Sequence, residues 1–335
     1  MQEIKNNARK LMKGYCRVCP VCDGRACAGE VPGMGGLGTA ASFAANIEAL
    51  RRHRFVMRLI HEVRQPELGI RLFGQDLALP VLAAPIGGVS FNMGGGVSEQ
   101  DYCHAVIKGC VSRGTLGCTG DGVPAFIHES GFAAIGEAGG QGIPWIKPWE
   151  DSELFEKIAK AQETGTKIIG MDIDAAGLVT LRKMGRPVGP KTVSQLRQIR
   201  AAIKGTFLLK GVMTVADALL ALEAGVDGIV VSNHGGRVLD FAPGAAEVLP
   251  AIAKAVAGRM AVLADGGVRS GADVLKLLAL GAQAVLIGRP IAVAAVGGLQ
   301  AGVEAYLDAI RLELQQCMVL TGTAQASAVD PAILC

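Results

Sequence analysis

The clearest structural pattern in the sequence is FLLKGVMTVADALLALEAGVDGIVVSNHGG (207–236). It contains a short apolar run (207–211), a segment with helical spacing of apolar residues (215–225), and a second apolar run (228–236) that ends in polar residues and glycines. Short apolar runs that alternate with helical segments are typical of parallel strands joined by crossover helices. The stretch therefore predicts a β-α-β unit.

The same unit recurs from Leu79 onward. Eight strand candidates are present: LPVLAAP (79–85), GTLGCTG (114–120), IPWIKP (143–148), KIIGMDID (167–174), FLLKG (207–211), GIVVSNHGG (228–236), MAVLADGG (260–267) and AVLIGRP (284–290). Helical patterns separate them, at 98–113, 151–164, 215–225, 248–258 and 271–281 among others. Eight such units predict an α/β fold of the TIM (β/α)8 barrel type, with an open doubly wound sheet as the alternative.

Two regions are expected, although a barrel of this length can form around one core. Residues 1–65 form an N-terminal extension and residues 66–335 form the barrel with a helical C-terminal tail. Within the extension, residues 1–44 are rich in Gly and Cys and are expected to be irregular, and a helix is expected over 41–60. A hairpin expected over 69–80 then leads into the repeating units.

Composition excludes several classes of protein. The 33 basic and 30 acidic residues give a net charge of +3 without a basic run, so no nucleic-acid partner is expected. No apolar run approaches the roughly 20 residues of a membrane span, and the first fifteen residues lack the apolar core of a signal peptide, so a cytoplasmic protein is expected. The nine cysteines are then expected to be reduced thiols or metal ligands.

Two adjacent strand ends predict a phosphate site. The seventh strand leads into Asp265, Gly266, Gly267 and Arg269, and the eighth into Gly288 and Arg289. Glycines allow backbone N–H groups to approach an anion, and an arginine binds phosphate with two parallel hydrogen bonds. Barrels often bind phosphate at these two loops. Lys210 ends the fifth strand, where its ammonium either faces an anionic or electron-rich group or extends to solvent.

The sixth strand carries the strongest catalytic pattern. It runs into SNHGGRVLD (232–240), which places His234 three residues before Arg237 at the catalytic rim of a barrel. Oxidation of a 2-hydroxy acid needs a cation to hold the carboxylate and a base to take a proton while hydride leaves the α-carbon. Arg237 and His234 suit these two roles.

These residues resemble the FMN-dependent 2-hydroxy acid oxidases and dehydrogenases, a family that includes glycolate oxidase, lactate oxidase and FMN-dependent L-lactate dehydrogenase. The resemblance is specific over 207–290. It implies a small lactate-like or glycolate-like L-2-hydroxy acid as substrate, a homotetramer, His234 as base and Arg237 as substrate clamp. It also implies FMN contacts from Lys210, Ser232, Asp265, Gly266, Gly267, Arg269, Gly288 and Arg289, and from the first-strand loop Pro85, Ile86 and Gly87.

The N-terminal half departs from the family pattern. The sequence has Ile146, Lys147 and Pro148 where the family carries a Gln and a Tyr, and Asp172 and Asp174 where it carries a Thr and an Asp. Tyr15 is the nearest candidate for the family's N-terminal Tyr, and Arg182 or Arg186 would have to supply a second substrate arginine. Fold and FMN are therefore better defined than the substrate.

Four cysteines in the extension have ligand-like spacing. Cys16, Cys19, Cys22 and Cys27 are separated by two, two and four residues, a pattern that resembles iron-sulfur ligation and also suits zinc. An iron-sulfur cluster would carry electrons from the flavin toward an acceptor protein; the alternatives are a structural metal and unligated thiols. The other cysteines, Cys103, Cys110, Cys118, Cys317 and Cys335, are expected to be buried apolar residues or a tail thiol.

Two other functions remain open from the sequence. An FMN-dependent isomerase resembling type 2 isopentenyl diphosphate isomerase would share the barrel and phosphate site but would have no use for the SNHGGR arrangement. A flavin-binding or metal-binding redox carrier would follow if the altered third and fourth strands had abolished substrate binding.

Overall fold

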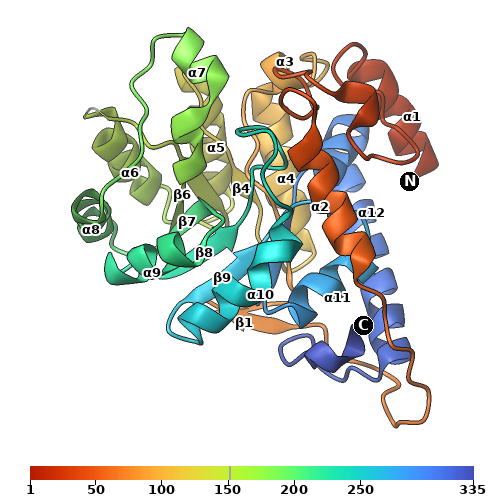
Figure 1. The fold of residues 1–335 in the computed structure, drawn as a ribbon. Coiled ribbons are helices and arrows are strands. Elements are labelled where there is room, and N and C mark those ends of the chain that lie inside the picture. Colours follow the sequence, from red (N-terminus) through yellow and green to blue (C-terminus); the bar gives the residue numbers. More distant parts are fainter. Residues whose placement is uncertain (151) are drawn as a thin grey trace.

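Eight short parallel strands form a closed barrel in the computed structural model, which describes residues 1–150 and 152–335 (Figure 1). The barrel strands are β3 (Val81–Ala83), β4 (Cys118–Thr119), β5 (Ile143–Ile146), β6 (Ile168–Asp172), β7 (Thr206–Val212), β8 (Gly228–Val231), β9 (Ala261–Ala264) and β10 (Ala284–Ile287). The sheet order is β3-β10-β9-β8-β7-β6-β5-β4, and a parallel bridge between Ala83 and Gly117 closes the ring. The predicted barrel is confirmed, and the open sheet is excluded.

The strands are short apolar runs because both of their faces are covered. Every residue of β8 and β10 is buried. Close pairing also dictates a small residue in β6: Gly170 pairs with Trp145 of β5, and a Cβ at Gly170 would lie 2.3 Å from the indole. A larger residue there would force the two strands apart.

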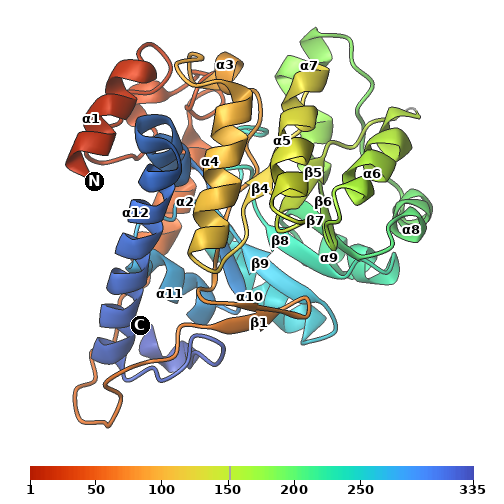
Figure 2. The ribbon, with the colours of Figure 1, turned by 180° about the vertical axis from the view of Figure 1, so that it is seen from behind.

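Helices surround the barrel on its outer face (Figures 1 and 2). They are α4 (Glu99–Ser112), α5 (Ala125–Glu137), α6 (Glu153–Glu163), α8 (Val193–Ala202), α9 (Val215–Glu223), α10 (Ala245–Val256), α11 (Gly271–Ala279) and α12 (Arg289–Thr321). The short helices α3 (Val89–Asn92) and α7 (Val179–Lys183) and the 3-10 turn η2 (Ile173–Gly177) lie in the loops after β3 and β6, and the 3-10 turn η3 (Pro331–Ile333) lies near the C-terminus. The five helices named from the sequence pattern are all present.

The predicted hairpin closes one end of the barrel. Strands β1 (Ile70–Leu72) and β2 (Gln75–Leu77) pair antiparallel. The ring of Phe73, in the turn, lies close to Gly228 at the start of β8. The hairpin therefore covers the amino ends of the strands, and the carboxyl ends are left for chemistry.

The first residues are helical, so the prediction of an irregular segment over 1–44 is wrong there. Helix α1 (Gln2–Leu11) lies beside α12 (Figure 1). Ala8 and Met12, four residues apart, are fully buried. The Asn7 side chain donates to Gly297 O at 2.7 Å, and a Cβ at Gly297 would lie 2.1 Å from Ile4 O. A small residue on α12 thus lets α1 pack closely, a contact that the local sequence does not reveal.

The helix predicted over 41–60 is also shorter than expected. Helix α2 (Ala41–Arg52) stops at Arg52, because the next residues form extended backbone pairs with the C-terminus. Arg54 and Cys335 exchange two backbone hydrogen bonds, and Val56 N donates to Ile333 O. Pairing with a segment distant in sequence therefore overrides the helical spacing of the apolar residues.

Helix α12 is long and apolar enough to cross a membrane by length and composition alone. In the barrel it packs against α1, α4 and α11, and 56% of its most apolar window is buried (Figure 2). Leu299, at φ +47°, interrupts the helical backbone. These contacts identify α12 as the terminal helix of the barrel.

Candidate active site

A cavity opens at the carboxyl ends of the strands and collects nearly all the predicted site residues. These are Pro85, Ile86 and Gly87 after β3, Lys210 in β7, His234 and Arg237 after β8, Asp265, Gly266, Gly267 and Arg269 after β9, and Gly288 and Arg289 after β10. Ser232 does not line the cavity. It is fully buried behind the wall, so its predicted flavin contact stays a prediction.

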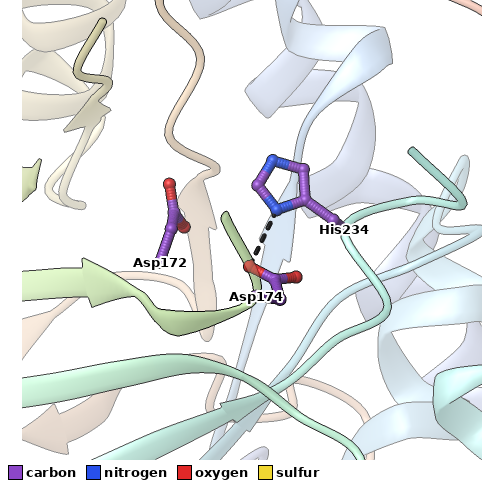
Figure 3. A group of neighbouring side chains, drawn as sticks. All are labelled: Asp172, Asp174 and His234. Atoms are coloured by element: carbon purple, nitrogen blue, oxygen red, sulfur yellow. Dashed lines mark hydrogen bonds and ion pairs between the residues drawn. The ribbon is translucent and has the colours of Figure 1, made fainter. Parts of the chain in front are cut away.

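His234 is paired with a carboxylate (Figure 3). Its Nδ1 lies 3.0 Å from Asp174 Oδ1, in turn η2 after β6. Burial opposes ionisation of Asp174, but His234 and Lys210 outweigh it and hold the pKa of Asp174 below its usual value. An ionised carboxylate can only accept a hydrogen bond, so Nδ1 carries a proton and the neutral imidazole keeps its lone pair on Nε2. That nitrogen is the one available to act as a base.

The backbone that presents His234 is strained and supported on both sides. His234 has φ +57°, a left-handed conformation that is uncommon outside glycine, and Gly235 and Gly236 continue with positive φ. The His234 N–H donates to Ser232 Oγ at 3.0 Å, and Gly236 N–H donates to Asn233 O at 3.0 Å. Strain of this kind persists where the surroundings fix it, which is frequent at active sites.

Helix α2 supplies part of this support. Asn46 Nδ2 donates to Asn233 Oδ1 at 2.7 Å, and Asn46 Oδ1 accepts from Ala245 N at 3.0 Å. Asn233 in turn donates to Ser42 O and Pro243 O. Both amides are buried, so their hydrogen bonds rigidly connect the N-terminal extension to the catalytic loop.

Lys210 is not a surface lysine. It is 3% exposed, and its Nζ lies 3.6 Å from Asp172 and 3.7 Å from Asp265. Burial alone would lower the pKa of Lys210, but Asp172, Asp174 and Asp265 raise it well above its usual value. The ammonium is therefore a fixed positive charge on the cavity wall.

Asp172, Asp174 and His234 place their ligand atoms within 4.8 Å of one another, which is close enough for a metal ion (Figure 3). Two ammonium groups already face Asp172, from Lys210 at 3.6 Å and Lys147 at 4.0 Å. A divalent cation would meet their repulsion. The arrangement is better suited to proton transfer than to metal binding.

Three half-buried arginines, Arg237, Arg269 and Arg289, follow strands β8, β9 and β10 and line the same cavity. Burial lowers the pKa of Arg237 to about 10, and burial with repulsion from Arg237 and Arg269 lowers that of Arg289 to about 9. Arg289 stacks on Phe43, 4.0 Å from the ring centroid. Nε of Arg269 and Oδ1 of Asp265 are buried without a hydrogen-bond partner among the described residues. A group of three cations with one unused donor, Arg269 Nε, fits a phosphate ester.

Arg237 lines the cavity but is held by the N-terminal extension. Its Nη1 donates to Gly33 O and to Gly35 O, and its Nη2 donates to Asn92 Oδ1 at 3.0 Å. Arg289 donates to Met34 O and Gly35 O at 2.7 and 2.9 Å. Carbonyls 33–35 therefore bind both guanidinium groups at the mouth of the site.

The tyrosine and second-arginine candidates for substrate binding do not line the cavity. Among the described residues that line the cavity none is a tyrosine, and Tyr15 packs against Gly94 instead. Arg182 is exposed, and Arg186 pairs with Glu153 and stacks over Trp149. Neither arginine lines the cavity, so the expectation that one of them supplies a second substrate cation is wrong. Lys147 lines the cavity and lies 4.0 Å from Asp172.

Some functional side chains give little signal in the sequence. Asp174 stands where the resembled family carries an Asp, and a carboxylate two residues beyond a strand end is a signal for a histidine partner. Phe43 and Asn46 on α2 give no local signal, because they contact distant residues: Asn46 bonds Asn233, 187 positions away, and Phe43 packs against Arg289, 246 positions away.

The chain is similar to known proteins along most of its length. A family model described as FMN-dependent dehydrogenase matches residues 33–187 and 179–335. 4-Hydroxymandelate oxidase of Amycolatopsis orientalis is 32% identical over 328 residues, covering 86% of this chain and 88% of that protein. The chain belongs to the FMN-dependent 2-hydroxy acid dehydrogenase and oxidase family.

Further relatives agree with this assignment. A peroxisomal (S)-2-hydroxyacid oxidase of Arabidopsis thaliana is 30% identical, with 83% of each chain covered. An L-lactate dehydrogenase of Caulobacter vibrioides is 51% identical over 141 residues, 42% of this chain and 37% of that protein. The solved structure of mandelate oxidase with benzoyl-formic acid has a TM-score of 0.81 at 29% identity, covering 100% of this chain and 97% of that one.

This FMN-dependent 2-hydroxy acid dehydrogenase or oxidase therefore has FMN as its cofactor. A mandelate oxidase variant solved with a C4a-OH-FMN adduct matches with a TM-score of 0.78 at 30% identity, covering 99% of this chain and 98% of that one. The unused donor of Arg269, the arginine group and the glycine-rich loops after β9 and β10 fit the phosphate end, and Lys210 fits the flavin ring.

Replacement of Arg289 by methionine is expected to weaken FMN binding by about 10- to 100-fold, because a charge-assisted contact with phosphate is lost. Fluorescence titration of the apoprotein with FMN measures the effect. Arg311→Met, on α12 away from the cavity, is the matched control. Equal affinity in the Arg289 variant and the wild type would remove Arg289 from the phosphate site.

Proposed function

We propose that the protein oxidises a small L-2-hydroxy acid, lactate-like or glycolate-like, to the corresponding 2-oxo acid by hydride transfer to FMN. The observation that carries the proposal is the Asp174–His234 pair, at 3.0 Å, whose histidine lines the same cavity as Arg237. It combines an oriented base with a carboxylate-binding cation in one cavity.

His234 would take the proton of the substrate hydroxyl at Nε2. Asp174 keeps Nδ1 protonated and stabilises the imidazolium that forms, because the carboxylate stays ionised beside it. FMN, when bound, would supply the acceptor for the α-hydrogen and its pair of electrons. The substrate loses one proton to His234 and one hydride to the cofactor, which balances its oxidation to the 2-oxo acid.

Arg237 would orient the substrate through its carboxylate. A planar guanidinium can give two parallel hydrogen bonds to a carboxylate, which fixes the direction of the α-carbon. In the structure those donors bind carbonyls 33 and 35 and Asn92, so substrate binding must exchange at least one of these partners for the carboxylate.

The remaining wall is mainly apolar, which favours a substrate with an apolar group on the α-carbon. Its apolar members are Val31, Pro32, Met34, Phe91, Ile127, Leu178, Leu181 and Met184. Lys147 and Asp172 provide the nearby charges, and they are paired with each other. The methyl group of lactate suits such a wall better than an additional charge does.

The test is the anaerobic visible spectrum of the FMN-loaded enzyme before and after addition of L-lactate, D-lactate, glycolate or L-mandelate. Bleaching of the flavin band at about 450 nm by L-lactate or glycolate is expected, since hydride transfer reduces the flavin. Bleaching by D-lactate alone, or by mandelate alone, would contradict the proposed substrate while leaving the enzyme class intact.

A further inference from the structure

The four cysteines of the extension lie in one loop region after α1 and take no part in the chemistry described above. Cys16, Cys19, Cys22 and Cys27 are half-buried, and none forms a disulfide. The other five cysteines behave as expected from the sequence: Cys103, Cys110 and Cys118 are buried, Cys317 is partly buried, and Cys335 is an exposed tail thiol. Only the first four are spaced like metal ligands.

The loop that carries these thiols is closed on itself. The Met34 N–H donates to Tyr15 O at 3.2 Å, and Arg17 Nη2 pairs with Glu30 Oε1 at 2.7 Å. These contacts join the chain on either side of the cysteines, so all four lie within one closed loop.

Hydrogen-bond donors point at two of the sulfur atoms. The Val18 N–H donates to Cys16 Sγ at 3.4 Å, and Arg269 Nη2 lies 3.5 Å from Cys22 Sγ and 3.3 Å from Cys22 O. Val18 adopts φ +46°, a conformation that is strained for a β-branched residue. Hydrogen bonds to cysteine sulfur are among the features by which proteins tune iron-sulfur clusters.

The spacing of the four cysteines favours an iron-sulfur cluster over a single zinc ion. Zinc sites commonly take two ligands from each of two separated loops, whereas three cysteines with two residues between each pair are typical of cluster ligation. Among the described residues, the group whose ligand atoms all lie within 4.8 Å does not include these cysteines. Their sulfur atoms are thus more widely spread than tetrahedral coordination of one ion requires.

We propose that Cys16, Cys19, Cys22 and Cys27 ligate an iron-sulfur cluster of the 4Fe–4S type at the wall of the flavin site. Arg269 belongs to both sites, since it contacts Cys22 and also lines the cavity. Arg289 likewise lines the cavity, and it donates to Met34 O and Gly35 O in the segment that follows the four cysteines. The cluster would therefore lie directly behind the two arginines that fit the FMN phosphate.

This position gives the cluster a role that rests on the proposed function. Oxidation of one hydroxy acid releases two electrons and two protons. The electrons would leave the flavin one at a time through the cluster, each passing to a one-electron acceptor protein, while the protons go to solvent. The enzyme would then act as a dehydrogenase with a protein acceptor.

The site is tested by iron and sulfide analysis of the full chain, purified anaerobically, treated with ferrous iron and sulfide, and desalted. About four iron and four sulfide per chain are expected, with a paramagnetic signal after reduction by dithionite. The double variant Cys19→Ser, Cys22→Ser should lose both elements, and Cys335→Ser, which removes the exposed tail thiol, should retain them. FMN binding by the double variant verifies that it folds.

One zinc without sulfide, no bound metal, or iron retained by the double variant would each overturn the proposal. Flavin reduction by the hydroxy acid distinguishes failure of the cluster site from failure of the proposed function. If dithionite gives the cluster signal but an anaerobic hydroxy acid leaves the flavin oxidised, the proposed function fails and the cluster stands. If the hydroxy acid bleaches the flavin but no iron is bound, the proposed function stands and the cluster fails.

Discussion

His234→Ala is expected to lower the rate of flavin reduction by L-lactate by about 10²- to 10⁴-fold, the usual contribution of a general base. The variant loses the nitrogen that takes the hydroxyl proton, while Arg269, Arg289 and the loops after β9 and β10 remain to hold FMN. Anaerobic stopped-flow absorbance of the FMN-loaded variant measures the rate directly, without dependence on the electron acceptor.

The control is His61→Ala. His61 does not line the cavity, and its ring contacts the backbone of Arg58 and Val63. This variant should reduce its flavin at the wild-type rate. Loss of bound FMN from the His234 variant would mean that the histidine supports the cofactor, and an unchanged rate in that variant would assign the base to another residue.

The barrel and the main site could be predicted because their signals are local. Strand ends at Lys210, His234, Asp265 and Arg289 follow continuous apolar runs, and in a barrel those ends meet on one rim. A buried strand must be apolar on both faces, so its limits are visible in the sequence. Once the fold is known, the polar residues just after each strand are the site.

The remaining features depend on contacts between distant segments. Helix α1 is fixed by Gly297 of α12, and α2 ends where the C-terminus pairs with Arg54. The support of the catalytic loop by Asn46 has the same character. Likewise, no local pattern indicates that carbonyls 33 and 35 bind Arg237. Such features require the tertiary structure, because the residues involved are ordinary in their own sequence context.

Arg237→Lys is expected to weaken binding of the hydroxy acid by about 10- to 100-fold, because an ammonium cannot reproduce the planar fork of a guanidinium. The dissociation constant of a 2-hydroxy acid comes from the concentration dependence of anaerobic flavin reduction. Arg182→Lys is the matched control, since Arg182 is exposed and lies outside the cavity wall.

Measuring how Arg237→Lys changes the binding of the hydroxy acid and of its neutral 2-hydroxy amide distinguishes two roles of Arg237. The first is binding the substrate carboxylate, and the second is holding the N-terminal extension in place. If Arg237 binds the carboxylate, the substitution should penalise the acid far more than the amide, because only the acid presents an anion to the guanidinium. Lysine would also break the fork on carbonyls 33 and 35 and so loosen the loop they belong to. That loosening would affect acid and amide alike. Equal weakening of both ligands would therefore assign Arg237 to holding the N-terminal extension in place, and it would remove the residue from substrate recognition.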